Sequence, residues 1–316
     1  MKLKKYKDNP ILQPLRENSW ESGAVFNPGS LYKNGKVHLL YRAVGEYKNY
    51  ISCIGYATSL DGFNFTRESV CPVLEPQAEY NEWGIEDPRI VELEGKVYIT
   101  YVSFSKPALT EGKLSYTVLV STENFHRFKR IGIIVPKNID DRDTVLFPER
   151  IRGRYIMLHR PQEWTGSDYR EWKSHNPSSI WLAISDNLKN WGQHRVLMKP
   201  EEEWEFKKIG IGPSPIKTAK GWLLIYHGVD KDNIYRVGAA MLDLNDPTKV
   251  IGRTKNPIME PEERHEREGD IPNVVFPTGA VVIDNVLYVY YGAADKVICL
   301  ATCDLDDLVN FLLNGK

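Results

Sequence analysis

The sequence predicts an all-β fold, a five-bladed β-propeller with a short C-terminal helix, formed by residues 1–316 as one domain. Three observations support this prediction. A hairpin motif that begins with proline recurs five times, a second motif that ends in proline recurs in step with it, and almost no segment has helical periodicity. Two independent markers that repeat together indicate a repeat architecture.

Each copy of the first motif is a proline, an apolar strand, a turn and a second strand. The first two copies read PGSLYKNGKVHLLYR and PRIVELEGKVYITY. The five copies begin at Pro28, Pro88, Pro148, Pro213 and Pro277. The steps between these prolines are 60, 60, 65 and 64 residues, which predicts one structural unit per step.

The second motif, as in CPVLEP and NPIMEP, has its five copies ending at Pro14, Pro76, Pro136, Pro200 and Pro261. A third strand and a turn follow each hairpin, as in CIGYATSLDGFNF. Three or four short alternating strands per unit, joined by Gly, Asn and Asp turns, are typical of a propeller blade. A β-sandwich would not require five units in register and is less favoured. The tail LDDLVNFLLNGK has helical periodicity and predicts the final helix.

Composition excludes several functions. The chain has 41 Lys and Arg against 42 Asp and Glu, so neither nucleic acid nor a membrane is expected as a partner. The seven histidines show no HExxH motif and no Cys/His metal spacing, so we expect no metal and no cofactor. The four cysteines are scattered, and no hydrophobic stretch follows the basic start MKLKKYKDNP, which favours a cytoplasmic protein.

In a propeller the innermost strands converge on one mouth of a central channel, so equivalent positions of the repeats should meet there. The residues before the five hairpin prolines are Asn27, Asp87, Phe147, Gly212 and Phe276. The far ends of the same hairpins carry Arg42, Ser103, Arg160, His227 and Asp295. This arrangement predicts one central acid, Asp87, surrounded by cations and aromatic rings.

A structural role is the alternative for this acid: Asp87 would cap a turn, and Arg89 would pair with Glu86 or Asp87. The repeat favours a functional role, because only one blade carries a carboxylate before its hairpin proline. A structural role should recur in the other blades.

Several motifs together resemble a known family over essentially the full chain. They are NPGSLYKNGKVHLLYRA, GIEDPRI, FPERI with MLHRP, KIGIGPSPI, YHGV and FPTGAVVIDNVLYVYYGAAD. The chain resembles glycoside hydrolase family 130, the β-mannoside phosphorylases, and among them the mannooligosaccharide phosphorylase type. The resemblance implies a five-bladed catalytic domain that performs a glycosyltransferase-type reaction. A β-1,4- or β-1,2-linked mannoside and inorganic phosphate would give α-mannose 1-phosphate with inversion.

The resemblance also implies roles for individual residues. Asp87 would be the proton donor, acting through the 3-hydroxyl of the mannosyl ring. The residues matching sugar-binding positions are Asn27, Arg42 and Asp295. Those matching phosphate-binding positions are Arg150, Lys208 and His227, with Arg160 a weaker match. Pro148 is expected to direct Arg150 into the channel, although Glu149 could pair with it.

Two other functions remain open at this stage. An inverting β-mannosidase of the same family would need a second carboxylate to activate water. The acidic segment from Glu260 to Asp270 could supply a glutamate, although solvated surface is the favoured interpretation over a lid or an oligomer contact. A non-catalytic, glycan-binding propeller is the third hypothesis, after the phosphorylase and the mannosidase. The linkage, the acceptor sugar and the formation of a homo-oligomer are left open.

Overall fold

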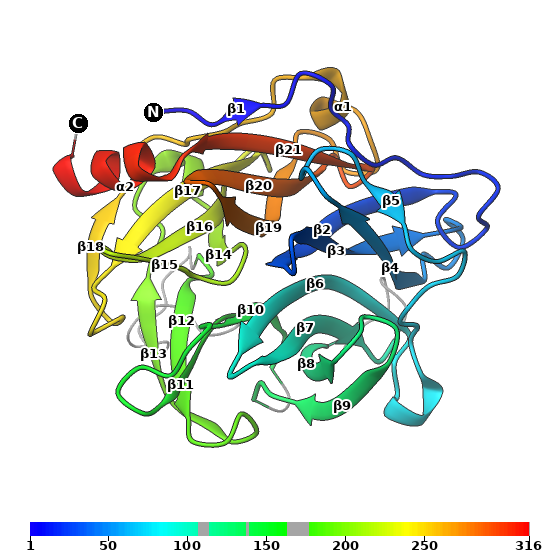
Figure 1. Ribbon diagram of the computed structural model, residues 1–316, viewed down its shortest axis with the longest axis horizontal. Coiled ribbons are helices and arrows are strands. Elements are labelled where there is room, and N and C mark those ends of the chain that lie inside the picture. Colours follow the sequence, from blue (N-terminus) through cyan, green and yellow to red (C-terminus); the bar gives the residue numbers. More distant parts are fainter. Residues whose placement is uncertain (107–113, 137–138, 163–176, 316) are drawn as a thin grey trace.

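The computed structural model describes residues 1–106, 114–136, 139–162 and 177–315. Five antiparallel sheets surround a central axis, which confirms the predicted five-bladed propeller (Figure 1). Blade one contains β2 (Ala24–Lys33), β3 (Lys36–Val44), β4 (Ser52–Ser59) and β5 (Thr66–Arg67). Blade two contains β6 (Gly84–Leu93), β7 (Lys96–Phe104), β8 (Ser115–Thr122) and β9 (Phe128–Ile133). Blade three contains β10 (Asp141–Leu146), β11 (Tyr155–Pro161), β12 (Ile180–Ser185) and β13 (Trp191–Met198).

The last two blades depart slightly from this pattern. Blade four contains β14 (Lys208–Ile211), β15 (Ile216–Thr218), β16 (Gly221–Val229), β17 (Tyr235–Leu242) and β18 (Val250–Arg253). Blade five contains β19 (Val275–Ile283), β20 (Val286–Ala293), β21 (Val297–Asp304) and, from the N-terminus, β1 (Lys4–Lys5). The short helices are η1 (Ala78–Tyr80), η2 (Glu203–Glu205) and α1 (Arg264–Arg267), and α2 (Leu305–Asn314) is the predicted C-terminal helix.

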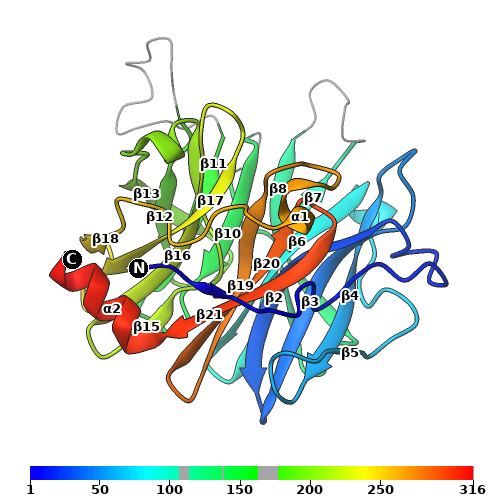
Figure 2. The same cartoon turned by 90° about the horizontal axis from the view of Figure 1, so that it is seen from above.

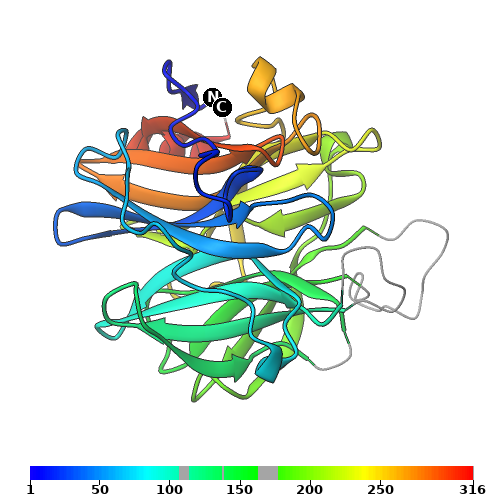
Figure 3. The ribbon, with the colours of Figure 1, turned by 90° about the vertical axis from the view of Figure 1, so that its right-hand side faces the viewer.

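The N-terminal segment completes the last blade. β1 pairs antiparallel with β21, and the Tyr6 amide continues the contact by donating to the Leu300 carbonyl at 2.9 Å. Figure 2 shows this segment running along the outside of blade five. The two chain ends therefore lie close together beside that blade (Figures 1 and 3). In the described part of the chain, no helix is long and apolar enough to cross a bilayer.

Apolar side chains fill the spaces between neighbouring blades. One cluster joins Leu40 and Ile54 of blade one to Ile85 and Ile99 of blade two. Because both faces of each sheet are covered, β4 and β16 are buried along their whole length. This packing makes the inner strands a rigid frame for the residues at their ends.

Bulges at the start of three inner strands direct polar side chains to one mouth of the channel. The ladders β2–β3, β6–β7 and β10–β11 each shift register by one residue there. The bulged residues Asn27, Asp87 and Asp143 have positive φ values of 48°, 53° and 53°. Asn and Asp tolerate this left-handed backbone better than most residues.

The bulges correct the predicted alignment of blade three. Asp143, and not Phe147, is the counterpart of Asp87 in this blade. The prediction that Phe147 lies at the mouth is wrong: it is 1% exposed and packs edge-on against Trp222 at 5.1 Å. Two blades therefore carry a carboxylate at the ring position, so the argument from a single such blade does not hold.

Candidate active site

A cavity of about 200 Å³ lies at this mouth, and residues from all five blades line it. We call it the central cavity. Its charged and hydrogen-bonding side chains are Asn27, Arg42, Glu86, Asp87, Arg142, Asp143, Arg160, Lys208, His227, Tyr235 and Asp295. The structure thus brings together every residue to which the family resemblance assigned a role except Arg150.

The Asp87 carboxylate faces this cavity with few protein partners. Its Oδ1 accepts a hydrogen bond from Asn27 Nδ2 at 2.8 Å and lies 3.7 Å from Arg42 Nη1. Arg89 does not pair with it: the Arg89 guanidinium donates to the Asp87 carbonyl, the Gly212 carbonyl and Asp143 Oδ1. Among the described residues, none donates to Asp87 Oδ2. The carboxylate is therefore held in place by Asn27 and by Arg42, a cation that it shares with Glu86.

Arg42 lies beside this acid and orients toward it. One of its nitrogens, Nη2, forms an ion pair with Glu86, and its guanidinium stacks on the Phe26 ring at 4.7 Å. Arg42 Nε and Asn27 Oδ1 are buried and have no hydrogen-bond partner in the described part of the chain. Buried polar atoms rarely remain unsatisfied, so these two atoms indicate that a polar ligand completes the site.

Asp143 organises the opposite half of the cavity. Its Oδ1 is 3.1 Å from Arg89 Nη2, and its Oδ2 is 2.5 Å from Arg160 Nε and 3.8 Å from His227 Nε2. Although burial opposes ionisation, the neighbouring cations, first Arg160, hold the pKa of Asp143 well below its usual range. Asp143 is thus an ionised anchor for cations, whereas Asp87 has no such set of partners.

The basic side chains of this half retain unused hydrogen-bonding capacity. Arg160 Nη1 and both ring nitrogens of His227 are buried without a partner among the described residues. Withdrawal from water, reinforced by Arg160, lowers the pKa of Lys208 to about 7, and its Nζ lies 5.0 Å from the centre of the Tyr235 ring. Burial also lowers the pKa of His227 well below its usual value, which favours the neutral ring. An anion bound here would accept hydrogen bonds from these groups and stabilise the charged form of Lys208.

Asp295 lies on the Asp87 side of the cavity. Burial raises its pKa to about 7; the positive charge of Arg42 opposes this shift, and the negative charge of Asp87 adds to it. Its backbone is also left-handed, with a φ of 51°. Asp295 can therefore hold a proton or share one with a ligand hydroxyl near neutral pH.

The structure contradicts the expected position of Arg150. This residue follows the far end of β10, where its Nε donates to Glu94 Oε1 at 2.7 Å and its guanidinium stacks on Tyr155 at 4.0 Å. Glu149 does not pair with Arg150; it binds Lys217 Nζ at 2.7 Å. Arg150 therefore lies outside the central cavity, because the chain leaves the channel before it reaches Pro148.

Arg142, which the sequence analysis missed, lines the cavity from blade three. It lies opposite Arg160 in the β10–β11 ladder. The segment DRDTVL places it directly before the bulged Asp143, as Glu86 precedes Asp87 in EDPRIV. That similarity could have identified Arg142 from the sequence, but Thr144 occupies the position at which the other copies have proline.

The acidic segment supplies no glutamate to the cavity. Glu266 is fully buried and accepts hydrogen bonds from Lys5 Nζ at 2.7 Å and the Tyr291 hydroxyl at 2.8 Å. Glu260 pairs with Lys2 and Arg236. From this region only Ile271 and Val274 line the central cavity. The expectation of plain solvated surface is therefore wrong for Glu266, which anchors the N-terminal segment.

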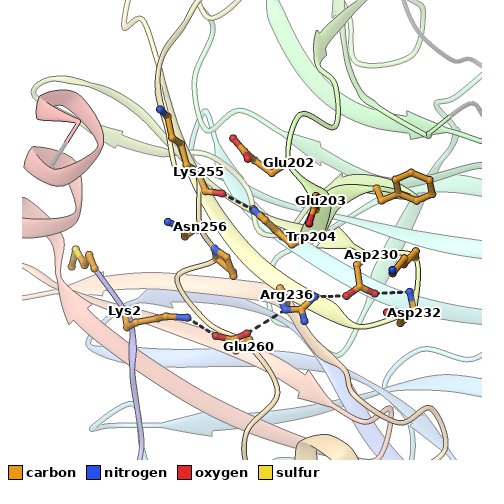
Figure 4. Close-up of a pocket in the computed structure, with 14 residues that line it drawn as sticks. Lys2, Glu202, Glu203, Trp204, Asp230, Asp232, Arg236, Lys255, Asn256 and Glu260 are labelled. Atoms are coloured by element: carbon orange, nitrogen blue, oxygen red, sulfur yellow. Dashed lines mark hydrogen bonds and ion pairs between the residues drawn. The ribbon is translucent and has the colours of Figure 1, made fainter.

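A larger depression, which we call the outer groove, lies beside η2 and the N-terminus and measures about 1020 Å³ (Figure 4). Several of its charged groups bind one another. Arg236 pairs with Asp230 at 2.6 Å and with Glu260 at 3.3 Å, and Trp204 Nε1 donates to the Lys255 carbonyl at 2.9 Å. No side-chain atom of its described lining is buried without a hydrogen bond. The central cavity is the better candidate for an active site.

Comparison with known proteins identifies the family. A family model described as β-1,4-mannooligosaccharide phosphorylase matches residues 2–314. The chain belongs to glycoside hydrolase family 130. Within it, the chain is 44% identical to a 1,2-β-oligomannan phosphorylase of Thermoanaerobacter sp. (strain X514), over 98% of this chain and 99% of that protein. It is 31% identical to a β-1,4-mannooligosaccharide phosphorylase of Ruminococcus albus, over 98% of this chain and 90% of that protein.

Solved structures of family 130 members agree with this fold. The β-1,2-mannobiose phosphorylase of Listeria innocua, in complex with β-1,2-mannobiose, superposes with a TM-score of 0.84 at 30% identity, covering 99% of each chain. A second structure has a TM-score of 0.81 at 27% identity, over 96% of this chain and 94% of the other. Its description states that family 130 contains glycoside hydrolases that target β-1,2 mannosidic linkages in Candida mannan. Family membership alone therefore leaves two reactions to compare.

Proposed function

We propose that this family 130 chain is an inverting phosphorylase of β-1,2-linked mannosides that releases α-mannose 1-phosphate. The observation that carries the proposal is the division of the central cavity. Asp87 lies on one side, and Arg160 and Lys208 lie on the other near one carboxylate, Asp143, while Arg142 of the same lining pairs with Asp140. An excess of cations with unused donors suits a phosphate dianion, which an arginine binds through charge-assisted hydrogen bonds.

In the proposed reaction, Asp87 gives its proton to the 3-hydroxyl of the mannosyl ring, and that hydroxyl gives its own proton to the bridging oxygen. The bond from C1 to the bridging oxygen breaks, and the leaving sugar departs with a new hydroxyl group. A phosphate oxygen attacks C1 from the opposite face, so the β-linkage becomes an α-phosphate. Asn27 and Arg42 would hold the mannosyl ring through their unsatisfied atoms, and Asp295 would hold it through its carboxyl group.

A family 130 hydrolase is the second candidate, because such enzymes exist in the family. An inverting hydrolase needs a carboxylate base on the face of the sugar opposite its acid. On that side of the central cavity the carboxylate is Asp143, which is ionised but bound by Arg160 and Arg89. A carboxylate so occupied is a poor base, whereas the surrounding cations suit phosphate.

The β-1,2 linkage is proposed from the relatives. The proteins with 44% and 40% identity are named for β-1,2-linked substrates, whereas the β-1,4-mannooligosaccharide phosphorylase is 31% identical. The 4-O-β-D-mannosyl-D-glucose phosphorylase of Bacteroides fragilis is 26% identical. A mannose unit is therefore favoured over glucose as the acceptor.

We also propose a cytoplasmic location, which rests on the cysteines. Cys53, Cys71, Cys299 and Cys303 are all free thiols in the structure. Reduced thiols are typical of proteins in a reducing compartment.

The deciding experiment incubates the protein with β-1,2- or β-1,4-mannobiose, with and without inorganic phosphate. Mannose 1-phosphate and free mannose are then measured side by side. We expect mannose 1-phosphate only with phosphate, and faster from the β-1,2 substrate. Free mannose formed at the same rate without phosphate, and no mannose 1-phosphate, would identify a hydrolase and overturn the proposal.

A further inference from the structure

A second cavity of about 200 Å³ adjoins the central cavity and has no role in the reaction described so far. We call it the side cleft. It shares Arg42, Glu86 and Arg142 with the central cavity, and Trp83 and Phe104 extend it outward. Small-molecule sites typically measure roughly 300–1,000 Å³. Neither cavity reaches that size alone, but the two together do, so a disaccharide with phosphate would need both.

The side cleft lies on the side where a leaving group belongs. Most of its lining comes from blades one and two: Tyr50 and Ser52 at the start of β4, Trp83 and Gly84 at the start of β6, and Phe104 at the end of β7. Lys208 and the buried nitrogens of Arg160 and His227, which have no partner in the described part of the chain, come from blades three and four. Since inversion requires attack from the face opposite the departing oxygen, phosphate over blades three and four places the leaving sugar toward blades one and two.

Trp83 offers an aromatic surface at this cleft. Its side chain is 38% exposed, although large aromatic residues of this fold are mostly buried. The Trp83 amide donates to the Phe104 carbonyl, so the residue is attached to the rigid end of the β6–β7 ladder. Phe104, which also lines the cleft, is 7% exposed, and the Arg142 guanidinium stacks on its ring at 5.5 Å. An exposed ring on a rigid support, at the edge of a polar cavity, is a good platform for a ligand.

Pyranose chemistry matches such a platform. A β-mannopyranosyl ring carries the axial hydrogens of C1, C3 and C5 on one face, while its axial 2-hydroxyl projects from the other. The hydrogen-bearing face is apolar and weakly positive, which suits the negative face of an indole ring. The hydroxyl groups at the ring edge would then meet the polar residues shared by the two cavities.

We propose that the side cleft binds the leaving, or acceptor, sugar and that Trp83 determines acceptor specificity by packing against its pyranose ring. The proposal rests on the proposed phosphorylase function and adds to it the location of the second substrate unit. Because Trp83 is open to solvent, a longer β-mannan extends past it, so oligosaccharides as well as mannobiose are substrates.

The test uses the reverse reaction, in which mannose 1-phosphate donates to a mannose or β-1,2-mannobiose acceptor. Trp83→Ala should raise the KM of the acceptor about tenfold, the equivalent of about 1.4 kcal/mol, and leave the KM of mannose 1-phosphate unchanged. Trp83→Phe should restore most of the acceptor affinity. Phe206→Ala is the matched control, because Phe206 is an exposed ring, 46% accessible, in the outer groove.

A binding measurement separates this proposal from the proposed function. Calorimetric titration of β-1,2-mannotriose into Asp87→Asn protein, with and without Trp83→Ala, does not require turnover. A roughly tenfold weaker affinity in the double variant supports the side cleft whatever the reaction. An unchanged affinity, or an equal rise of both KM values in the reverse reaction, would overturn the role of Trp83. Wild-type protein that binds the trisaccharide but never forms mannose 1-phosphate would overturn the phosphorylase function alone.

Discussion

The central cavity and the outer groove contain the same kinds of side chain but use them differently. In the outer groove, Arg236 lies between Asp230 and Glu260, and these three charges are paired with one another (Figure 4). In the central cavity, Arg89 and Arg160 share one carboxylate, Asp143, and buried nitrogens of Arg160 and of the nearby His227 have no hydrogen-bond partner among the described residues. The groove has about 1020 Å³ and the cavity about 200 Å³. Unsatisfied polar atoms are therefore a better guide to the active site than size.

This contrast has a physical basis. A buried charge without a partner destabilises the fold, and such charges are found where a bound ligand offsets the destabilisation. Saturated ion pairs instead stabilise the local fold. Substitutions in the central cavity should accordingly affect turnover, and substitutions in the outer groove should affect stability.

The largest expected effect is that of Asp87→Asn. Loss of a general acid typically reduces the rate by roughly 100- to 10,000-fold, so phosphorolysis should fall by about that factor. The melting temperature should change little, because Asn tolerates the left-handed backbone at this position, where φ is 53°. Asp230→Asn in the outer groove is the matched control and should retain full activity. A fall in stability without loss of turnover would instead assign Asp87 a capping role.

Lys208→Met should weaken the binding of phosphate more than the binding of the mannoside. Removing one charge-assisted contact should raise the KM of phosphate about 10- to 100-fold, with a much smaller change for the mannoside. The melting temperature should stay the same or rise, since the ammonium group is withdrawn from water in the free protein. Steady-state kinetics with each substrate varied in turn tests this. Equal losses for phosphate and mannoside would show that Lys208 supports the cavity as a whole.

The next largest effect should be the change of phosphate affinity with pH. The pKa of Lys208 is lowered to about 7 from 10.5, so its positive charge is lost as the pH rises through 7. Phosphate affinity should therefore fall from pH 6 to pH 8. Lys208→Arg keeps its charge over this range and should give a flatter profile, while the second ionisation of phosphate affects both proteins equally. Parallel profiles for the two proteins would contradict a titrating Lys208.

Much of the fold and part of the site could be predicted from the sequence. The blade count follows from a repeat of about 60 residues that is visible in the positions of the prolines. Asn27 and Asp87 were located because each precedes a hairpin proline. The proline repeat therefore predicted both the number of blades and the position of Asp87.

The cavity residues of blade three could not be predicted from the position of its proline. Its bulge uses Asp143 and Thr144, and the nearby Pro148 lies beyond the other end of the same inner strand. Proline marked the repeat, but backbone register determines which side chains reach the cavity. Arg150 was therefore misplaced, and Arg142 and Asp143 were missed. Tyr235 was missed because it begins a third strand, β17, which no motif marked as facing the channel.

Arg236→Ala should produce the opposite result from the substitutions in the cavity. It leaves the Asp230 and Glu260 carboxylates, which are only partly exposed, without this cation. The free energy of unfolding should fall by about 1–3 kcal/mol, and turnover at a temperature where the variant is folded should be unchanged. Urea denaturation and the mannobiose assay measure the two quantities. Lost activity in a fully folded variant would mean that the outer groove contributes to the reaction.

The smallest effect is expected for Arg150→Ala, the residue that sequence similarity assigned to phosphate. Its side chain is 39% exposed and its partner Glu94 is 53% exposed, and exposed ion pairs contribute little because water screens them. The KM of phosphate should therefore remain within about twofold of wild type. Arg160→Lys is the informative companion, since it keeps the charge beside Asp143 but loses the planar fork and should weaken phosphate binding. If Arg150→Ala impaired phosphate binding and Arg160→Lys did not, the phosphate site would lie outside the central cavity, and unsatisfied polar atoms would have been the wrong guide.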